Sequence, residues 1–237
     1  MPAILKLNGL LPNCAHNRFA NVRPGTVIPT GPQLLPAKYL PFDLSMLKAE
    51  FESAPGLVDP EDPSTFYFGA CPYRVYQSIH LLTTTPNILK DKLLTMKKIV
   101  EVGSGLGICS FILSQLLPAV PIIQGVEIDQ KLLEASKQMK MRLEQFEYDL
   151  SNVSFFNKDV RQQAMGDVDC VIGWFPLGEG ITSAELVSVF KSLPKGGLVF
   201  ELYNQYPLND HNVWTNGFLR VNLNGLSKIA FHIYERV

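Results

Sequence analysis

The sequence predicts a doubly wound α/β domain, with a mostly parallel sheet between helices and an antiparallel addition at the C-terminal end. Apolar runs typical of buried strands alternate with amphipathic helical runs from residue 98 onward, which is the pattern of a parallel sheet covered on both faces. Two closing segments, 218–223 and 228–235, alternate between apolar and polar residues and resemble an antiparallel pair. We expect this pair to form an antiparallel edge of the sheet.

The N-terminal third has a different composition from the rest. Twelve of the 17 prolines fall in residues 1–86, and polar turn residues separate them. Apolar side chains such as Tyr39 and Phe42 still give this segment surface to bury, which favours a packed arm over disorder. We therefore divide the chain into a proline-rich N-terminal extension or lid, 1–71, and a core domain, 72–237.

The core domain is expected to contain helices and strands in alternation. Pro72 suits the first turn of a helix, and Val75 and Ile79 then recur at helical spacing. A second short helix is expected from residue 86 to residue 93 or 94. The remaining elements are expected as strands at 98–102, 122–128, 153–156, 168–174 and 198–203, and as helices at 108–117, 130–148 and 183–193.

A glycine-rich turn separates the first strand from the helix that follows it. The motif reads Glu101-x-Gly103-x-Gly105-x-Gly107. Glycine permits positive φ and leaves no Cβ between a ligand and the backbone, and free N–H groups at a helix N-terminus bind small or anionic ligand groups well. We therefore expect a ligand to lie on this turn.

Acidic residues follow the next two strands, at the sheet edge where ligands bind in open parallel sheets. Glu127 ends the second strand, and a carboxylate there can accept both hydrogen bonds from a ribose diol. Asp159 ends the third strand, where capping of a following helix is the alternative role. A nicotinamide dinucleotide turn has its third glycine three positions after the second, whereas here the interval is two positions. This spacing disfavours a dinucleotide.

These motifs resemble those of the class I S-adenosylmethionine-dependent methyltransferases over roughly residues 72–237. The resemblance rests on the E-x-G-x-G-x-G turn, the G-V-E-I-D strand end, the N-K-D-V segment and D-V-D-C-V-I-G-W-F before the fourth crossover. It implies a seven-strand Rossmann-like sheet with an antiparallel final strand, and S-adenosyl-L-methionine as the cofactor.

The resemblance also implies how the cofactor's methionine end is bound. Gly103, Ser104 and Gly105 would lie against the methionine part, while Glu101 would help orient its amino group. Trp174 is a candidate for an aromatic face beside the sulfonium, with ordinary core packing as the alternative.

The adenosine end would be bound by residues at the ends of the second and third strands. Glu127 would accept hydrogen bonds from the ribose hydroxyls, and Ile128 would pack on the adenine. Asp159 would accept a hydrogen bond from the adenine amino group, with Val160 nearby.

The loop after the fourth strand normally contacts the methyl acceptor in this family. Here it reads G-W-F-P-L-G-E-G at 173–180, unlike the N-P-P-Y type loops of enzymes that methylate amino groups of bases or glutamine amides. The layout is similar to that of seven-strand protein-lysine methyltransferases, which implies a protein lysine as the leading acceptor and a small molecule as the next. No catalytic residue is assigned, because methyl transfer mainly requires that the nucleophile be aligned.

Two other functions are weighed against this one. A catalytically inactive methyltransferase fold would bind a partner without turnover, and an NAD(P)-dependent oxidoreductase would use a similar sheet with a different cofactor. The net charge of −1 gives no strong signal for a nucleic-acid partner.

Composition also bears on location and on metals. No run of 18 apolar residues is present, so we expect no membrane span, and the first 15 residues make a poor signal peptide. The four cysteines show no C-x-x-C spacing, so we expect no metal and no disulfide framework, a reducing cytoplasmic location, and buried thiols at Cys109 and Cys170.

Overall fold

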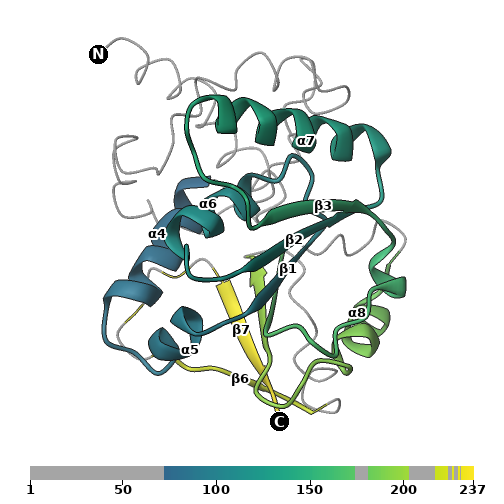
Figure 1. Ribbon diagram of the computed structural model, residues 1–237. Helices are drawn as coiled ribbons and strands as arrows, with labels where there is room; N and C mark the ends of the chain where they lie inside the picture. Colours follow the sequence, from purple (N-terminus) through teal and green to yellow (C-terminus); the bar gives the residue numbers. More distant parts are fainter. Residues whose placement is uncertain (1–71, 174–180, 203–216, 224–225, 227–228, 230) are drawn as a thin grey trace, which may run out of the picture.

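The computed structural model of the protein describes residues 72–173, 181–202, 217–223, 226, 229 and 231–237. The predicted N-terminal extension, the loop 174–180 and therefore Trp174 lie outside these residues. Within them, the chain forms a seven-stranded sheet with helices packed on both faces (Figure 1). The doubly wound α/β fold that the sequence predicts is therefore confirmed.

The elements follow one another in the alternating order that the hydrophobic pattern indicates. They are α4 (Pro72–Thr84), α5 (Lys90–Leu94), β1 (Lys98–Val102), α6 (Ile108–Leu116), β2 (Ile122–Glu127), α7 (Gln130–Gln145), β3 (Val153–Asn157), the 3-10 helix η5 (Val160–Gln162), β4 (Cys170–Gly173), α8 (Ser183–Phe190), β5 (Leu198–Leu202), β6 (Phe218–Arg220) and β7 (Phe231–Arg236).

The strands lie in the order β3-β2-β1-β4-β5-β7-β6. The first five strands of the chain pair in parallel, and β7 is antiparallel to both of its neighbours, β5 and β6. In the register, Val102 pairs with Val126 on one side and with Gly173 on the other. The carboxyl ends of the three central strands therefore meet at one edge of the sheet, where parallel sheets bind ligands.

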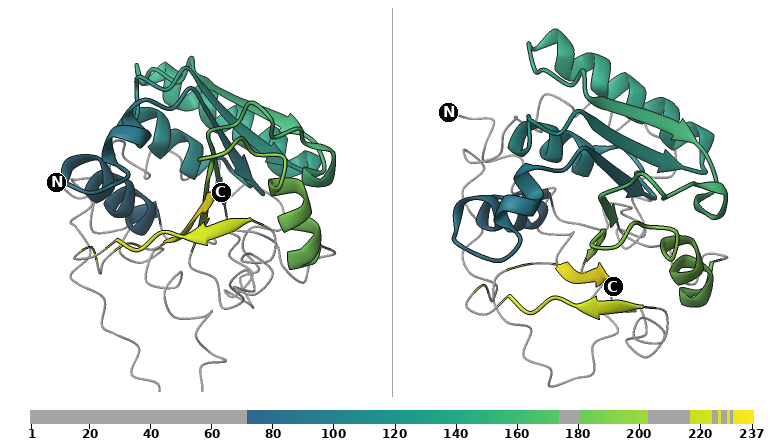
Figure 2. Two further views of the ribbon diagram at one scale, coloured as in Figure 1. Left: turned by 90° about the horizontal axis from the view of Figure 1, so that it is seen from below. Right: turned by 60° about the horizontal axis from the view of Figure 1, so that its bottom comes forward.

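The antiparallel pair at the edge of the sheet is confirmed, and the structure adds the order of its two strands. The last strand, β7, lies between β5 and β6, so β6 forms this edge of the sheet and β3 forms the opposite one (Figure 2). Ile233 and Tyr234 are neighbours in β7, and both are buried. Side chains of adjacent strand residues point to opposite faces, so β7 buries both faces, as an interior strand does.

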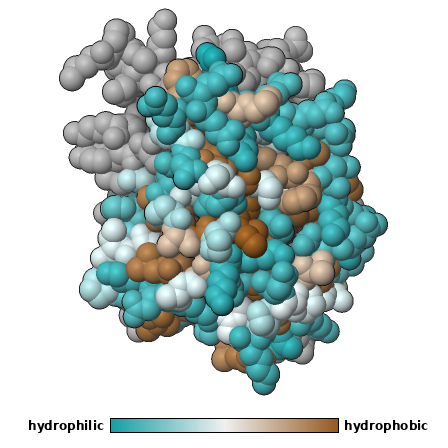
Figure 3. Space-filling model, viewed as in Figure 1, coloured by the Kyte–Doolittle hydropathy of each residue, from teal (hydrophilic) through white to brown (hydrophobic). Residues whose placement is uncertain are grey.

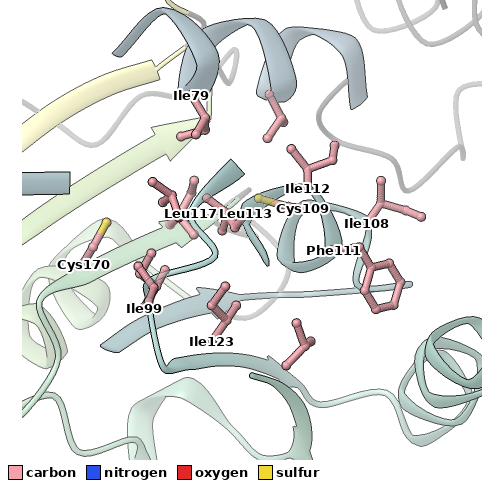
Figure 4. Packing of buried hydrophobic residues seen from close by; sticks show 14 of the residues in the cluster. Ile79, Ile99, Ile108, Cys109, Phe111, Ile112, Leu113, Leu117, Ile123 and Cys170 are labelled. Atoms are coloured by element: carbon pink, nitrogen blue, oxygen red, sulfur yellow. The ribbon is translucent and has the colours of Figure 1, made fainter. Parts of the chain in front are cut away.

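Two hydrophobic clusters, one on each face, hold the helices to the sheet. Ile99 belongs to the cluster with α4, α5, α6 and α7, while Val100 belongs to the cluster with η5 and α8. Figure 4 shows Ile108 and Ile112 of α6 among apolar residues from α4 and the strands. Cys109 and Cys170 are buried free thiols in the first cluster, as the sequence predicts.

The second helix, α5, begins at Lys90 and not at residue 86 as expected. Asn87 is the physical reason. Its side-chain amide donates to the carbonyl oxygens of Leu82 (2.8 Å) and Thr85 (2.7 Å), and its Oδ1 accepts from the N–H of Leu89 (2.8 Å). These side-chain bonds replace the helical hydrogen bonds of a first turn.

Other expected elements also end or begin elsewhere, and among them are the closing strands, which span Phe218–Arg220 and Phe231–Arg236 instead of 218–223 and 228–235. The fourth strand begins at Cys170, α8 ends at Phe190, and α7 ends at Gln145, three residues before the expected end. Beyond α7, Glu147 has a φ of 67°. The N–H of Glu147 bonds the carbonyl of Glu144 (3.0 Å), and that of Tyr148 bonds the carbonyl of Leu143 (3.3 Å). This pair of bonds is the Schellman pattern that terminates helices.

The part of the chain that the structure describes contains no helix long and apolar enough to cross a membrane. On the face shown in Figure 3, hydrophilic residues cover most of the surface, and apolar residues are visible between them in small groups.

Candidate functional site

The glycine-rich turn connects β1 to α6 and is tied to the end of β2. The N–H groups of Gly103 and Ser104 both donate to the carbonyl oxygen of Val126, at 2.9 and 3.1 Å. Gly103, Gly105 and Gly107 have φ values of 65°, 51° and 78°, which L side chains rarely adopt. Glycine at these positions therefore lets the chain fold back on itself within five residues.

The glycines serve two different purposes. A Cβ added to Gly105 would meet nothing within 4 Å, so this glycine faces open space. A Cβ on Gly107 would lie 2.3 Å from the ring of Phe155, and one on Gly125 would lie 2.4 Å from the same ring. The Phe155 ring, which contacts Phe111 edge to face, therefore supports the turn from within the core. The sequence-based assignment of Gly103 and Gly105 to the ligand gave no role to Gly107, and the structure shows that Gly107 makes room for the Phe155 ring.

Glu127 is brought directly against the glycine turn, although 22 residues separate it from Gly105. Its Oε2 accepts from the N–H of Gly105 at 2.8 Å, and its Oε1 accepts from the N–H groups of Ile128 (2.9 Å) and Asp129 (3.0 Å). The carboxylate is 7% exposed, whereas the side chain of Ile128 is 66% exposed. An anionic group and an uncovered apolar side chain thus lie next to each other at the end of β2.

Glu101 is the second buried acid of this edge, with 5% exposure. Its Oε2 accepts hydrogen bonds from both the N–H (2.9 Å) and the hydroxyl of Ser110, in the first turn of α6. Burial raises the pKa of Glu101 to about 8, the two bonds from Ser110 lower it, and the nearby Glu127 raises it further. A positive ligand group would favour the ionised form of this carboxyl.

Ser104 has a buried hydroxyl for which the described residues provide no hydrogen-bond partner. Its side chain lies in the turn itself, between Gly103 and Gly105, and is 5% exposed. Buried polar atoms in folded proteins are nearly always hydrogen-bonded, and an exception calls for a ligand or a water molecule. The hydroxyl fits a role in holding a polar group bound on the turn.

Asp159 follows β3 and caps η5, which is the alternative that the sequence left open. Its Oδ1 accepts from the N–H of Arg161 at 2.9 Å, and its carboxylate forms an ion pair with the Arg161 guanidinium. The hydrogen bonds from Arg161 lower the pKa of Asp159. Arg161 also lies 3.9 Å from Glu185 at the start of α8. Val160, the next residue, is buried in the cluster beneath α8 and η5.

Three residues support the site although the sequence had assigned no role to them. Ser110 holds Glu101, Phe155 supports two glycines, and the side-chain amide of Asn157 donates to the carbonyl oxygens of Glu127 (3.1 Å) and Ile128 (2.8 Å). The only sequence signals for them are a serine nine residues after the motif's acid and a polar residue at a strand end. Both signals are common in proteins that lack such a site.

The structure also allows a test for metals and for other hollows. In 72–173, 181–202 and the other described residues, no group of three or more His, Cys, Asp or Glu side chains is placed to hold a metal ion. A hollow of about 350 Å³ lies at the opposite end of β2 and β3, with Ser114, Asp149 and Asn152 in its wall. It is separate from the glycine turn.

Comparisons with known proteins bear on the fold. No protein-family model matches the chain, and no curated protein matches it. TrmN from Thermus thermophilus is similar in structure, with a TM-score of 0.50 and 18% identity over 71% of this chain and 49% of that one. The StiE O-MT has a TM-score of 0.44 and 20% identity over 60% of this chain and 50% of that one. This chain thus spans about half the length of each compared chain, which for StiE is the segment 942–1257.

A third solved structure matches over nearly its whole length. A putative S-adenosylmethionine dependent methyltransferase from Listeria monocytogenes has a TM-score of 0.48 and 9% identity over 69% of this chain and 98% of that one. The strand order β3-β2-β1-β4-β5-β7-β6, with β7 as the antiparallel strand, is the seven-strand sheet that the sequence motifs imply. The strand order and the similarity to TrmN therefore show that the chain has the fold of the class I S-adenosylmethionine-dependent methyltransferases.

Proposed function

We propose that the protein is an S-adenosyl-L-methionine-dependent methyltransferase. One observation carries the proposal: two buried carboxylates, Glu101 and Glu127, flank a glycine turn that is open at Gly105. These two acids disfavour an anionic diphosphate and favour a ligand with cationic groups and hydroxyl donors, because a cation beside Glu101 would favour its ionised form. S-adenosylmethionine has an ammonium group, a sulfonium and a ribose diol, whereas a nicotinamide dinucleotide would place phosphates here.

The residues present fit the cofactor at both ends. The space at Gly105 and the buried hydroxyl of Ser104 suit the methionine part, together with Gly103 and Glu101. Glu127 would accept from the ribose hydroxyls, in addition to its three backbone N–H donors. When bound, the cofactor would supply a methyl carbon already activated by the sulfonium, and the chain's own task would be to hold it in position.

The adenine would lie between the ends of β2 and β3. The exposed Ile128 offers an apolar surface for one face of the ring. Each oxygen of the Asp159 carboxylate already accepts two contacts from Arg161, so a bond from the adenine amino group would replace one of them. Val160, at the start of η5, would lie near the adenine. Trp174 would supply an aromatic face near the sulfonium.

Cofactor binding is tested by isothermal titration with S-adenosylmethionine. We expect binding by the wild-type protein, and Glu127→Gln to weaken it by roughly 1–3 kcal/mol, because a charged acceptor is lost. Glu134→Gln, on the exposed side of α7, is the matched control and should bind as the wild type does. Folded wild-type protein that shows no heat of binding at sub-millimolar cofactor would overturn the proposal.

The methyl acceptor forms part of the same proposal, with a protein lysine first and a small molecule next. A protein-lysine acceptor is supported by the layout of the chain, which resembles that of protein-lysine methyltransferases. The cytoplasmic location is also part of the proposal, and it rests on the cysteine pattern alone. Incubation with a cell lysate and radiolabelled cofactor, followed by separation of protein, nucleic acid and small molecules, identifies the acceptor class. Label confined to the nucleic-acid fraction would contradict both acceptors named here.

Two alternative functions have their own outcomes in these assays. A partner-binding protein without catalysis would bind the cofactor and transfer no label to any fraction. An NAD(P)-dependent oxidoreductase would be stabilised against heat by NADH and not by S-adenosylmethionine. The glycine spacing and the acid at position 101 favour S-adenosylmethionine over a nicotinamide cofactor, and the transfer of label separates the methyltransferase from the protein without catalysis.

A further inference from the structure

We propose that Ser110 is a positioning residue for the cofactor's amino group: it holds one carboxylate oxygen of Glu101, so that the other oxygen faces the ligand. This inference rests on the proposed function and extends it to a residue outside the glycine motif. Ser110 touches Glu101 and acts through it.

The geometry of the contact carries the inference. Both the N–H and the hydroxyl of Ser110 donate to the same oxygen, Oε2 of Glu101. Ser110 is fully buried, and Glu101 is 5% exposed. Two donors from one residue on one oxygen fix the carboxylate in a single orientation, because any rotation would leave buried donors without an acceptor.

The arrangement also replaces the missing cap of α6. The residue at the cap position, Gly107, has no side chain to accept from the first N–H groups of the helix, which otherwise lack partners. Glu101 accepts from one of these groups across the turn, and a negative charge is favoured at a helix N-terminus. The stability of α6 and the orientation of Glu101 therefore depend on the same contact.

The second oxygen of Glu101, Oε1, has no hydrogen-bond partner among the residues that the structure describes. An ammonium group has three N–H donors and a positive charge. It would therefore supply this oxygen with both a hydrogen-bond donor and a counter-ion. Two groups that titrate lie near Glu101: Glu127 at the end of β2 and Cys109 in α6. Cys109 is neutral, because burial raises the pKa of its thiol well above the ordinary value. Glu127 adds negative charge, which favours a cation.

The test compares ligands with and without an amino group. S-adenosylhomocysteine carries the amino-acid part, whereas methylthioadenosine has the same nucleoside without it. For Ser110→Ala we expect the dissociation constant of S-adenosylhomocysteine to rise about tenfold or more, and that of methylthioadenosine to change less than twofold. Ser110→Thr retains a hydroxyl and should recover most of the affinity for S-adenosylhomocysteine.

Ser114→Ala is the matched control. Ser114 is buried one turn further along α6, and its hydroxyl donates to Oδ1 of Asn152 at 2.6 Å, away from the turn. It should bind both ligands as the wild type does. Glu101→Gln provides a second route to the result if Ser110→Ala does not fold, and it should show the same ligand-selective loss.

The possible outcomes separate this inference from the proposed function. Equal weakening for both ligands, or none for either, in a folded Ser110→Ala protein would overturn the positioning role while cofactor binding by the wild type stands. Wild-type protein that binds neither ligand would overturn the proposed function itself, and the inference with it. Recovery by threonine together with selective loss in alanine supports it.

The pH profile gives a readout that a purely structural role would not move. The hydroxyl of Ser110 lowers the pKa of Glu101. In Ser110→Ala the pKa of Glu101 should therefore be higher. As the pH is lowered, affinity for S-adenosylhomocysteine should be lost at a higher pH than in the wild type. An identical profile for the wild type and Ser110→Ala would contradict the role.

Discussion

At Glu101, the requirements of folding and of ligand binding oppose each other. The carboxyl has an ordinary pKa of 4.5, and burial raises its pKa to about 8 in the folded protein. Between these values the folded state keeps a proton that the unfolded state has lost, so stability falls as pH rises from about 4.5 to about 8. Above that range the loss is complete.

We expect Glu101→Gln to remove this pH dependence. The amide stays neutral and can still accept from Ser110 through its oxygen, so the variant should be more stable than the wild type at pH 9 by a few kcal/mol (on the order of one per pKa unit). Near pH 5 the two proteins should differ little. Urea denaturation at both pH values measures the free energy of unfolding of the two proteins. The same difference in stability at pH 5 and at pH 9 would contradict the prediction.

Gly105 faces open space and Gly107 faces the Phe155 ring. The same substitution at both positions tests whether their roles differ. Gly105→Ala adds a Cβ in open space, so it should cost only about 1–2 kcal/mol of backbone strain but weaken cofactor binding at least tenfold. Gly107→Ala adds a Cβ against the Phe155 ring and should cost about 2–4 kcal/mol of stability.

Both variants are measured by urea denaturation and by cofactor titration. The cause assigned to the loss at Gly107 has its own control, because Phe155→Leu removes the atoms that a Cβ would meet. The double variant Gly107→Ala with Phe155→Leu should recover part of the stability lost in the single variant, relative to Phe155→Leu alone. Additive losses would show that the ring is not the obstacle.

At the scale of single elements, α7 ends in a conformation that its sequence does not favour. Glu147 is exposed and has a φ of 67°, the left-handed conformation in which glycine is preferred. Glu147→Gly should therefore stabilise the protein by about 0.5–1 kcal/mol. Gln145→Gly, two residues earlier in the helix, should instead destabilise it by about 1 kcal/mol. A thermal melt of each variant measures the sign, and destabilisation by both would refute the assignment.

On the scale of the whole molecule, the place of β7 decides which C-terminal residues matter. Ile233 of β7 is buried in the interior of the sheet, whereas Leu219 of the edge strand β6 is 43% exposed. Ile233→Ala should cost about 2–5 kcal/mol, and Leu219→Ala less than about 1 kcal/mol. Urea unfolding measures both losses, provided that the dependence of the unfolding free energy on urea concentration is the same in the variants as in the wild type. Equal losses would mean that the last strand lies at the edge.

Local patterns allowed most of the core fold and the main part of the site to be predicted. The strand, turn and helix around residues 98–117 follow from hydrophobic period and glycine chemistry, which act over a few neighbouring residues. Glu101 and Glu127 could be placed at one edge because parallel strands end together. Asn87 and Glu147 show the limit at element ends, where side-chain bonds and a left-handed residue change the boundary.

By itself, the sequence determined the alternation of strands and helices, the glycine turn and the acids Glu101 and Glu127 of the first two strands. Only the tertiary structure decided that β7 inserts between β5 and β6, that Phe155 accounts for Gly107 and Gly125, and that Ser110 holds Glu101. The physical reason is the range of the forces involved. Period and turn chemistry are encoded in adjacent residues, whereas close packing and the pairing of buried polar groups join residues that the chain keeps apart.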